Sequence, residues 1–161
     1  MTTHDPASAR TDRTPIQTAA ALVGAVFLLV GILGFVPGVT SDFDNMEFAG
    51  HESGAELLGV FQVSILHNIV HLLFGVAGLA LARSARGALA FLVGGGLIYL
   101  VLWIYGLLID HESSANFVPL NDADNWLHLG LGVAMIGVGL MLKPQDRPGA
   151  APPTNDPSMG R

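Results

Sequence analysis

Two histidines and an asparagine interrupt an apolar stretch of the chain. In the segment from His67 to Ala82 (HNIVHLLFGVAGLALA), His71 follows Asn68 by three residues and His67 by four. This spacing places them on one face of a helix, and two imidazoles at positions i and i+4 are able to bind one metal ion. Ionisable side chains among apolar residues of membrane length suggest a functional site.

A second stretch, Asp124 to Gly139 (DNWLHLGLGVAMIGVG), aligns with the first without a gap. The equivalent polar residues are Asn68 and Asn125, and His71 and His128. Ahead of each stretch stands the same tripeptide, His51-Glu52-Ser53 and then His111-Glu112-Ser113. Two motifs in the same order indicate a weak internal two-fold repeat of a loop and a helix, with both copies running in the same direction through a membrane.

Six polar residues of these two stretches form the candidate site: His67, Asn68, His71, Asp124, Asn125 and His128. Buried polar groups are normally hydrogen-bonded. The first interpretation is therefore a buried network that joins the second and fourth helices directly and sets their packing. On this interpretation the protein is a structural or interaction module of unknown biochemical activity.

Two alternatives give the same residues a ligand. A divalent metal could be held by His67 and His71, with His128 or Asp124 from the facing helix. A b-type haem could use His71 and His128 as axial ligands, although the side on which they lie has no basic residue for the propionates. No cofactor is predicted, and these two remain the candidates.

A further alternative is a small transport subunit coupled to protons or cations. Its histidines would lie below an acidic mouth that attracts cations. The chain has no cysteine, which excludes disulfides and thiolate sites. It also lacks the hydrolase motifs that would suggest an intramembrane enzyme, so an enzyme is not expected.

Composition places the chain in a membrane. Of its 161 residues 51% are hydrophobic and only 12% charged, and its mean hydropathy is +0.54. Four uncharged stretches are each close to the ~20 residues that a helix needs to cross a bilayer. They predict an all-α, four-helix transmembrane bundle over residues 16–142, with helices at about 16–36, 55–82, 88–109 and 122–142. Residues 1–15 and 143–161 are predicted to be disordered cytoplasmic tails.

The charges predict the orientation. All basic residues lie in the two tails or in the short middle loop: Arg10, Arg13, Arg83, Arg86, Lys143, Arg147 and Arg161. Because such segments stay in the cytoplasm, both termini are predicted to be cytoplasmic. The net charge of −6 argues against nucleic acid as a partner. The expected partners are the lipid bilayer and a second copy or another membrane protein, since small-residue stripes suit helix association.

Three motifs resemble a known family: Phe35-Val36-Pro37-Gly38, the run from His67 to His71, and the run from Asn116 to His128 (NFVPLNDADNWLH). Over about Thr18 to Leu142 the chain resembles domain of unknown function 4383, a family of small bacterial integral membrane proteins. The resemblance implies four spans in the bacterial cytoplasmic membrane, with the six polar residues as a shared set. It implies no activity.

Overall fold

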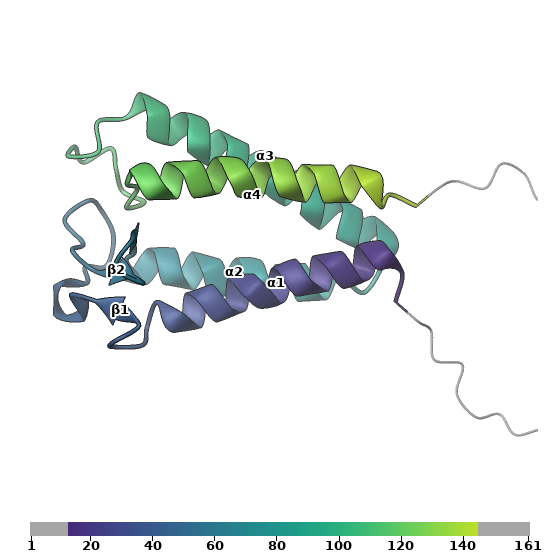
Figure 1. The fold of residues 1–161 in the computed structure, drawn as a ribbon, viewed down its shortest axis with the longest axis horizontal. Helices are drawn as coiled ribbons and strands as arrows, with labels where there is room; N and C mark the ends of the chain where they lie inside the picture. Colours follow the sequence, from purple (N-terminus) through teal and green to yellow (C-terminus); the bar gives the residue numbers. More distant parts are fainter. Residues whose placement is uncertain (1–12, 145–161) are drawn as a thin grey trace, which may run out of the picture.

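Four helices and a small sheet make up residues 13–144, which are the residues that the computed structural model describes (Figure 1). The elements are α1 (Pro15–Leu33), β1 (Thr40–Ser41), a 3-10 helix η1 (Phe43–Asn45), β2 (Glu56–Leu57), β3 (Phe61–Gln62), α2 (Ile65–Leu81), α3 (Ala85–Leu108) and α4 (Asp122–Met141). The chain is therefore mostly helical. The tails predicted for residues 1–15 and 143–161 lie outside the described residues, except for 13–15 and 143–144.

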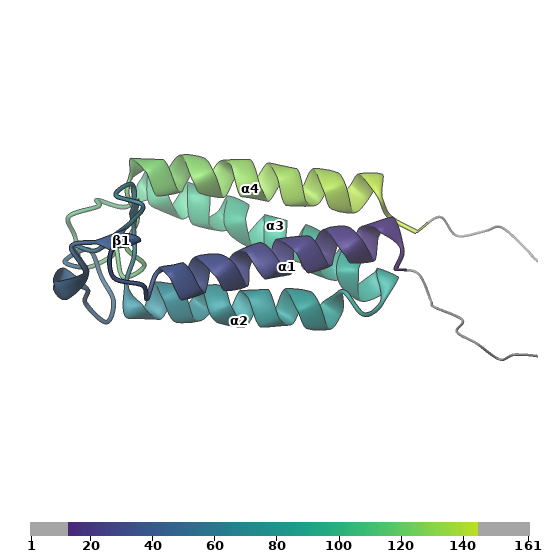
Figure 2. The same ribbon diagram turned by 60° about the horizontal axis from the view of Figure 1, so that its bottom comes forward.

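The helices form two antiparallel pairs. α1 packs along α2, and α3 packs along α4, while fewer contacts join one pair to the other. In Figure 2 α2 and α4 lie on opposite sides, with α1 and α3 between them. The prediction that the second and fourth helices pack directly on each other is therefore wrong. Glycines on all four helices let the backbones of α1 and α2, and those of α3 and α4, come into close contact. This close packing stabilises each pair.

The second helix is shorter than predicted. It begins at Ile65, whereas the sequence predicted a helix from about residue 55. Leu58 and Gly59 have φ angles of 57° and 66°, in the left-handed region, and a helix cannot continue through them. They form the turn between β2 and β3, so the chain folds into an antiparallel sheet of order β1-β2-β3 ahead of α2. The other helices start and end within three residues of their predicted bounds.

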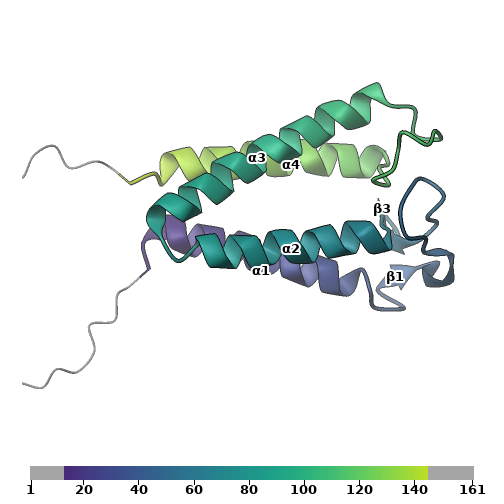
Figure 3. The ribbon, with the colours of Figure 1, turned by 180° about the vertical axis from the view of Figure 1, so that it is seen from behind.

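The two ends of the bundle differ in charge. One end carries the start of α1, the α2–α3 connection and the end of α4, and the other carries the sheet and both long loops (Figures 1 and 3). Within residues 13–144 the basic side chains lie at the first end: Arg13, Arg83, Arg86 and Lys143. The acidic side chains lie at the second end: Asp42, Asp44, Glu47, Glu52, Glu56, Asp110, Glu112, Asp122 and Asp124. Charge of each sign is thus confined to one end.

Large apolar side chains cover the outside of the helices. Exposed examples occur on every helix, among them Leu22, Val26, Leu29, Leu73, Val76, Leu97, Val101, Leu107, Val133 and Met141. Small residues and a few aromatic rings fill the interior, including Ala20, Phe27, Phe91 and Tyr99. α1 and α3 are long and apolar enough to cross a membrane, with mean hydropathies of 2.3 and 2.2. α2 is a shorter apolar helix.

Candidate functional site

The glycines of each pair bring the two backbones together in the same way. A Cβ atom on Gly75 would lie 2.7 Å from the carbonyl oxygen of Gly24, and one on Gly96 would lie 2.8 Å from that of Gly132. Conversely, a Cβ on Gly24 would lie 3.0 Å from the carbonyl oxygen of Gly75, and one on Gly132 would lie 3.0 Å from that of Gly96. The repeat predicted for a loop and a helix therefore extends to the helix that precedes the loop.

Each asparagine of the candidate site contacts the other helix of its own pair, Asn68 at the end of α1 and Asn125 near the end of α3. A Cβ on Gly34, which follows α1, would collide with the side chain of Asn68. A Cβ on Gly106, near the end of α3, would collide in the same way with Asn125. Neither amide reaches from α2 to α4, so the asparagines tie helices together within each pair.

Equivalent caps fix the start of α2 and of α4. The Ser64 side chain accepts a hydrogen bond from the backbone N–H of His67 at 3.1 Å. The Asn121 side chain accepts one from the backbone N–H of Asp124 at 2.9 Å. Such caps satisfy N–H groups that have no partner within the helix. They place His67 and Asp124, which are equivalent in the repeat, in the first turn of their helices.

A run of rings crosses the space between the pairs. The rings of His67 and His71 lie 4.4 Å apart, and His71 lies 5.5 Å from Phe27 of α1. Phe27 stacks on Tyr99 of α3 at 5.5 Å, and Tyr99 lies 5.2 Å from His128 of α4. Three of the predicted site residues thus belong to one cluster, together with Phe27 and Tyr99, which the sequence pattern did not assign to the site.

The three histidines differ in their hydrogen bonds. Nδ1 of His71 lies 3.1 Å from the carbonyl oxygen of His67 and donates to it, because a carbonyl only accepts. Nδ1 of His67 and Nδ1 of His128 are buried and have no partner. These two residues are only 8% and 3% exposed, so they lie away from the bulk solvent. An unpaired buried polar atom costs about 1–3 kcal/mol, which makes this pair unusual.

Asp124 is directed to the first loop and not to the histidines. Its Oδ2 accepts hydrogen bonds from the backbone N–H groups of Gln62 and Asn121, both at 3.2 Å. The Asn121 side chain also donates to the carbonyl oxygen of Val60 at 2.8 Å. The start of α4 is thereby attached to the sheet region of the other pair. Asp124 closes the mouth of the bundle above the histidines.

The second loop also closes over the bundle. The Asn116 side chain donates to the carbonyl oxygens of His111 and Leu120, and accepts from the N–H of Leu120 at 3.0 Å. Both Asn116 and Leu120 are buried. Phe117 and Val118, which stand between Asn116 and Leu120 in the sequence, line a cavity of the bundle.

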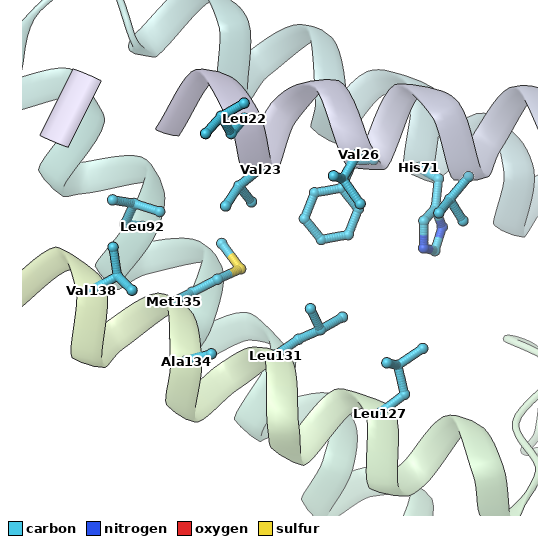
Figure 4. A pocket seen from close by; sticks show the side chains of 12 residues that line it. Leu22, Val23, Val26, His71, Leu92, Leu127, Leu131, Ala134, Met135 and Val138 are labelled. Carbon is cyan, nitrogen blue, oxygen red and sulfur yellow. The ribbon is translucent and has the colours of Figure 1, made fainter. Parts of the chain in front are cut away.

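Three cavities adjoin the ring cluster. His67, His71, Tyr99 and His128 line two of them, with volumes of about 260 and 240 Å³. A third cavity of about 380 Å³ extends from His71 between α1 and α4 as an apolar groove (Figure 4). Val30, His71, Leu127 and Leu131 line both this groove and the 240 Å³ cavity. The histidines therefore lie at the junction of a small chamber and a long apolar groove.

The metal and haem alternatives find little support in this geometry. Within residues 13–144 no group of three or more His, Asp or Glu side chains is arranged to hold a metal ion. The imidazoles of His67 and His71 lie against each other with their planes tilted by 31°. A haem between His71 and His128 would have to occupy the space taken by the stacked rings of Phe27 and Tyr99.

One comparison with known proteins gives a match. The family model described as domain of unknown function (DUF4383) matches residues 17–141, which is most of the chain. Neither the curated proteins nor the solved structures contain a match. The match covers all four helices apart from the first two residues of α1. The chain belongs to the DUF4383 family.

Proposed function

We propose that this protein is a four-span integral protein of the bacterial cytoplasmic membrane, with both termini in the cytoplasm, and that it acts as a binding or interaction module without catalytic activity. The observation that carries the proposal is the separation of charge. The four basic side chains of residues 13–144 lie at one end of the bundle and the nine acidic ones at the other. Basic residues next to membrane-spanning helices stay in the cytoplasm.

The apolar surface supports spanning by all four helices. Between the two charged ends each helix exposes large apolar side chains, a surface that suits lipid tails and not water. α2 has 17 residues and α4 has 20, which correspond to about 26 and 30 Å of helix. α2 packs along the longer helix α1, and α4 packs along the longer helix α3. All four helices would therefore span the same layer of the bilayer.

The interior supports a binding role over a catalytic one. Within the described residues it holds imidazoles, amides, a phenol, the Asp124 carboxyl and the Ser64 hydroxyl. The Ser64 hydroxyl accepts from the backbone N–H of His67 and is not paired with an imidazole. The small-residue contacts are used within each pair, and the outer faces are left to lipid, to a second copy or to another membrane protein. Size-exclusion chromatography with light scattering in mild detergent would measure the number of copies.

Cysteine labelling tests the orientation, since the chain has no cysteine of its own. Asp44→Cys and Ser114→Cys would place exposed thiols in the two long loops. We expect a membrane-impermeant maleimide to label both in cells whose outer membrane alone is permeabilised. Thr11→Cys and Ser158→Cys in the tails should react only after the inner membrane is lysed. Labelling of the tails first, or recovery of the protein in the soluble fraction, would overturn the proposal.

A further inference from the structure

The turn between β2 and β3 exposes apolar side chains in an acidic loop. Residues 57–61 (LLGVF) form an uncharged run at this turn. Leu57 is buried in a cluster with residues of α1, whereas Leu58 is 65% exposed and Val60 is 47% exposed. Leu58 and Val60 therefore present an apolar surface that the described residues leave uncovered.

Leu58 also has an unfavourable backbone conformation. Its φ angle of 57° lies in the left-handed region, which glycine and asparagine adopt more readily than leucine. Hydrogen bonds hold the turn from both sides. The N–H of Leu58 donates to the carbonyl oxygen of Val39, and the carbonyl oxygen of Val60 accepts from the Asn121 side chain. Packing of a buried side chain could offset the unfavourable backbone, but this side chain is mostly exposed. A leucine at this position is therefore explained by a contact outside the described residues.

The turn is level with the outer ends of α1 and α4. On one side, the cluster that buries Leu57 includes Val30 and Leu33 of the last turn of α1. On the other side, Val60 bonds at 2.8 Å to Asn121, the residue that caps α4. Figure 3 shows β3, which follows the turn, at the opening between the two pairs. The turn therefore lies beside the helix ends and not beyond them.

Exposed apolar side chains of the helices continue the surface of the turn. Leu58 lines one cavity with Leu127, which is exposed near the start of α4. Ile32, near the end of α1, is exposed as well. The neighbouring Trp126 is exposed, and tryptophan is enriched where lipid tails meet head groups. In the proposed membrane placement, the lipid that covers these side chains also reaches Leu58, so the inference rests on the proposed function.

The backbone of the turn already has the hydrogen bonds that insertion into lipid requires. A backbone N–H group without a partner is costly among lipid tails. The three N–H groups of the turn donate to backbone carbonyl oxygens, at 2.9 Å from Leu58 to Val39, 3.2 Å from Gly59 to Glu56 and 3.2 Å from Val60 to Leu57. The run from 57 to 61 carries no charge, so its entry into the bilayer buries no ion.

We propose that the turn between β2 and β3 anchors the first loop in the membrane. Leu58 and Val60 insert into the outer leaflet beside α1 and α4, at the boundary between head groups and lipid tails. Burial in lipid removes their apolar surface from water, which is favourable. Glu56 and Gln62, at the ends of the uncharged run, remain among the head groups. The partner of this surface is the lipid bilayer and not a protein.

Cysteine labelling of the full chain in cells tests this proposal, with the membrane-impermeant maleimide as the probe. We expect Leu58→Cys and Val60→Cys to escape labelling, although both positions are exposed in the fold. Asp44→Cys and Ser114→Cys are the matched controls and should react under the same conditions. All four thiols should react once the protein is denatured in sodium dodecyl sulfate. Reaction of Leu58→Cys at the rate of Asp44→Cys would overturn the proposal.

A nitroxide spin label on the same thiol distinguishes lipid from a protein partner. In vesicles of phosphatidylethanolamine and phosphatidylglycerol, we expect the label at Leu58→Cys to be relaxed by dissolved oxygen and not by a water-soluble nickel chelate. A label at Val133→Cys, on the exposed face of α4, should behave in the same way. A label at Asp44→Cys should show the opposite preference. A label at Leu58→Cys that meets neither reagent would lie under protein, as in a contact between two copies, and this result would also refute the anchor.

A further variant tests the contribution of Leu58 itself. Leu58→Asn accommodates the left-handed backbone and removes the apolar side chain. A spin label at Val60→Cys should therefore gain contact with the nickel chelate in this variant. A label at Val60→Cys that stays protected from nickel would contradict anchoring by Leu58.

The labelling experiment separates the two proposals. Labelling of Leu58→Cys together with Asp44→Cys and Ser114→Cys, ahead of the tails, would leave the membrane placement intact and refute only the anchor. A soluble chain, or one with the opposite orientation, would refute the placement on which the anchor depends.

Discussion

The pairs α1–α2 and α3–α4 share their helix contacts and differ in their loops. In both, two glycines ten residues apart meet a glycine and an asparagine of the second helix. They are Gly24 of α1 with Gly34 just after it, and Gly96 with Gly106 of α3. The loop between the helices covers residues 34–64 in the first pair and only 109–121 in the second. The longer loop contains the sheet.

The two pairs share one glycine contact and differ at one position of the candidate site. Contacts between backbones tolerate no Cβ atom, and glycines meet in this way in both pairs, Gly24 with Gly75 and Gly96 with Gly132. The first turns of α2 and α4 differ, because His67 stands in one copy where Asp124 stands in the other. His67 faces the interior chamber, and Asp124 accepts from Gln62 in the loop of the opposite pair. This one position thus faces the interior in the first pair and contacts the opposite pair in the second.

The largest expected effect tests whether the two pairs are equivalent. Gly75→Val and Gly132→Val each force a branched side chain against a backbone carbonyl. We expect each to lower the free energy of unfolding by about 3 kcal/mol or more. The measurement is the unfolding midpoint in detergent, followed by tryptophan fluorescence. Gly130→Ala and Gly137→Ala, where a Cβ has open space, should leave it nearly unchanged. A large loss in one pair and none in the other would show that the pairs are not equivalent.

A smaller effect is expected where the pairs differ. Asp124→Ala leaves the N–H groups of Gln62 and Asn121 without their acceptor and should cost about 1–3 kcal/mol. Hydrogen exchange at these two amides should accelerate. Asp124→Asn, which keeps an acceptor oxygen, should restore most of the protection. Val133→Ala on the exposed face of α4 serves as the comparison, and faster exchange at Gln62 in that variant as well would argue against a specific role for Asp124.

The smallest expected effect concerns the caps. Ser64→Ala and Asn121→Ala should each cost about 1 kcal/mol, the usual value for an N-cap. The loss should be greater for Asn121, because its side chain also donates to the carbonyl oxygen of Val60. Thermal unfolding of both variants in one detergent would measure the difference. A greater loss for Ser64 would mean that the bond to Val60 contributes nothing.

The sequence predicted where the helices lie along the chain, but not which helices pack against one another. An uncharged apolar stretch gives a helix its approximate bounds, as for α4 at Asp122–Met141. It does not say which helix its polar face meets. On α2 the polar residues divide between two directions, since Asn68 and Gly75 face α1 while His67 and His71 face the chamber. A spacing of three to four residues could not resolve two directions so close together.

The sheet and the aromatic part of the cluster left little signal in the sequence. Strands of two residues are too short for an alternating pattern. The turn before α2 depends on the left-handed backbone of Leu58 as well as Gly59, and a leucine gives no warning of it. Phe27 and Tyr99 stand among other apolar residues, so nothing marked them as neighbours of the histidines.

The connection between the pairs, residues 82–84, is only three residues long. It has the position of a pivot between α2 and α3, which diverge from it like two arms toward the loops (Figure 3). For a given angle of rotation a point on an arm moves in proportion to its distance from the pivot. Separation of the pairs at the histidines would therefore require a larger separation at the far end, where Asp124 and Asn121 bond the start of α4 to Gln62 and Val60 of the other pair. These bonds resist such an opening of the bundle.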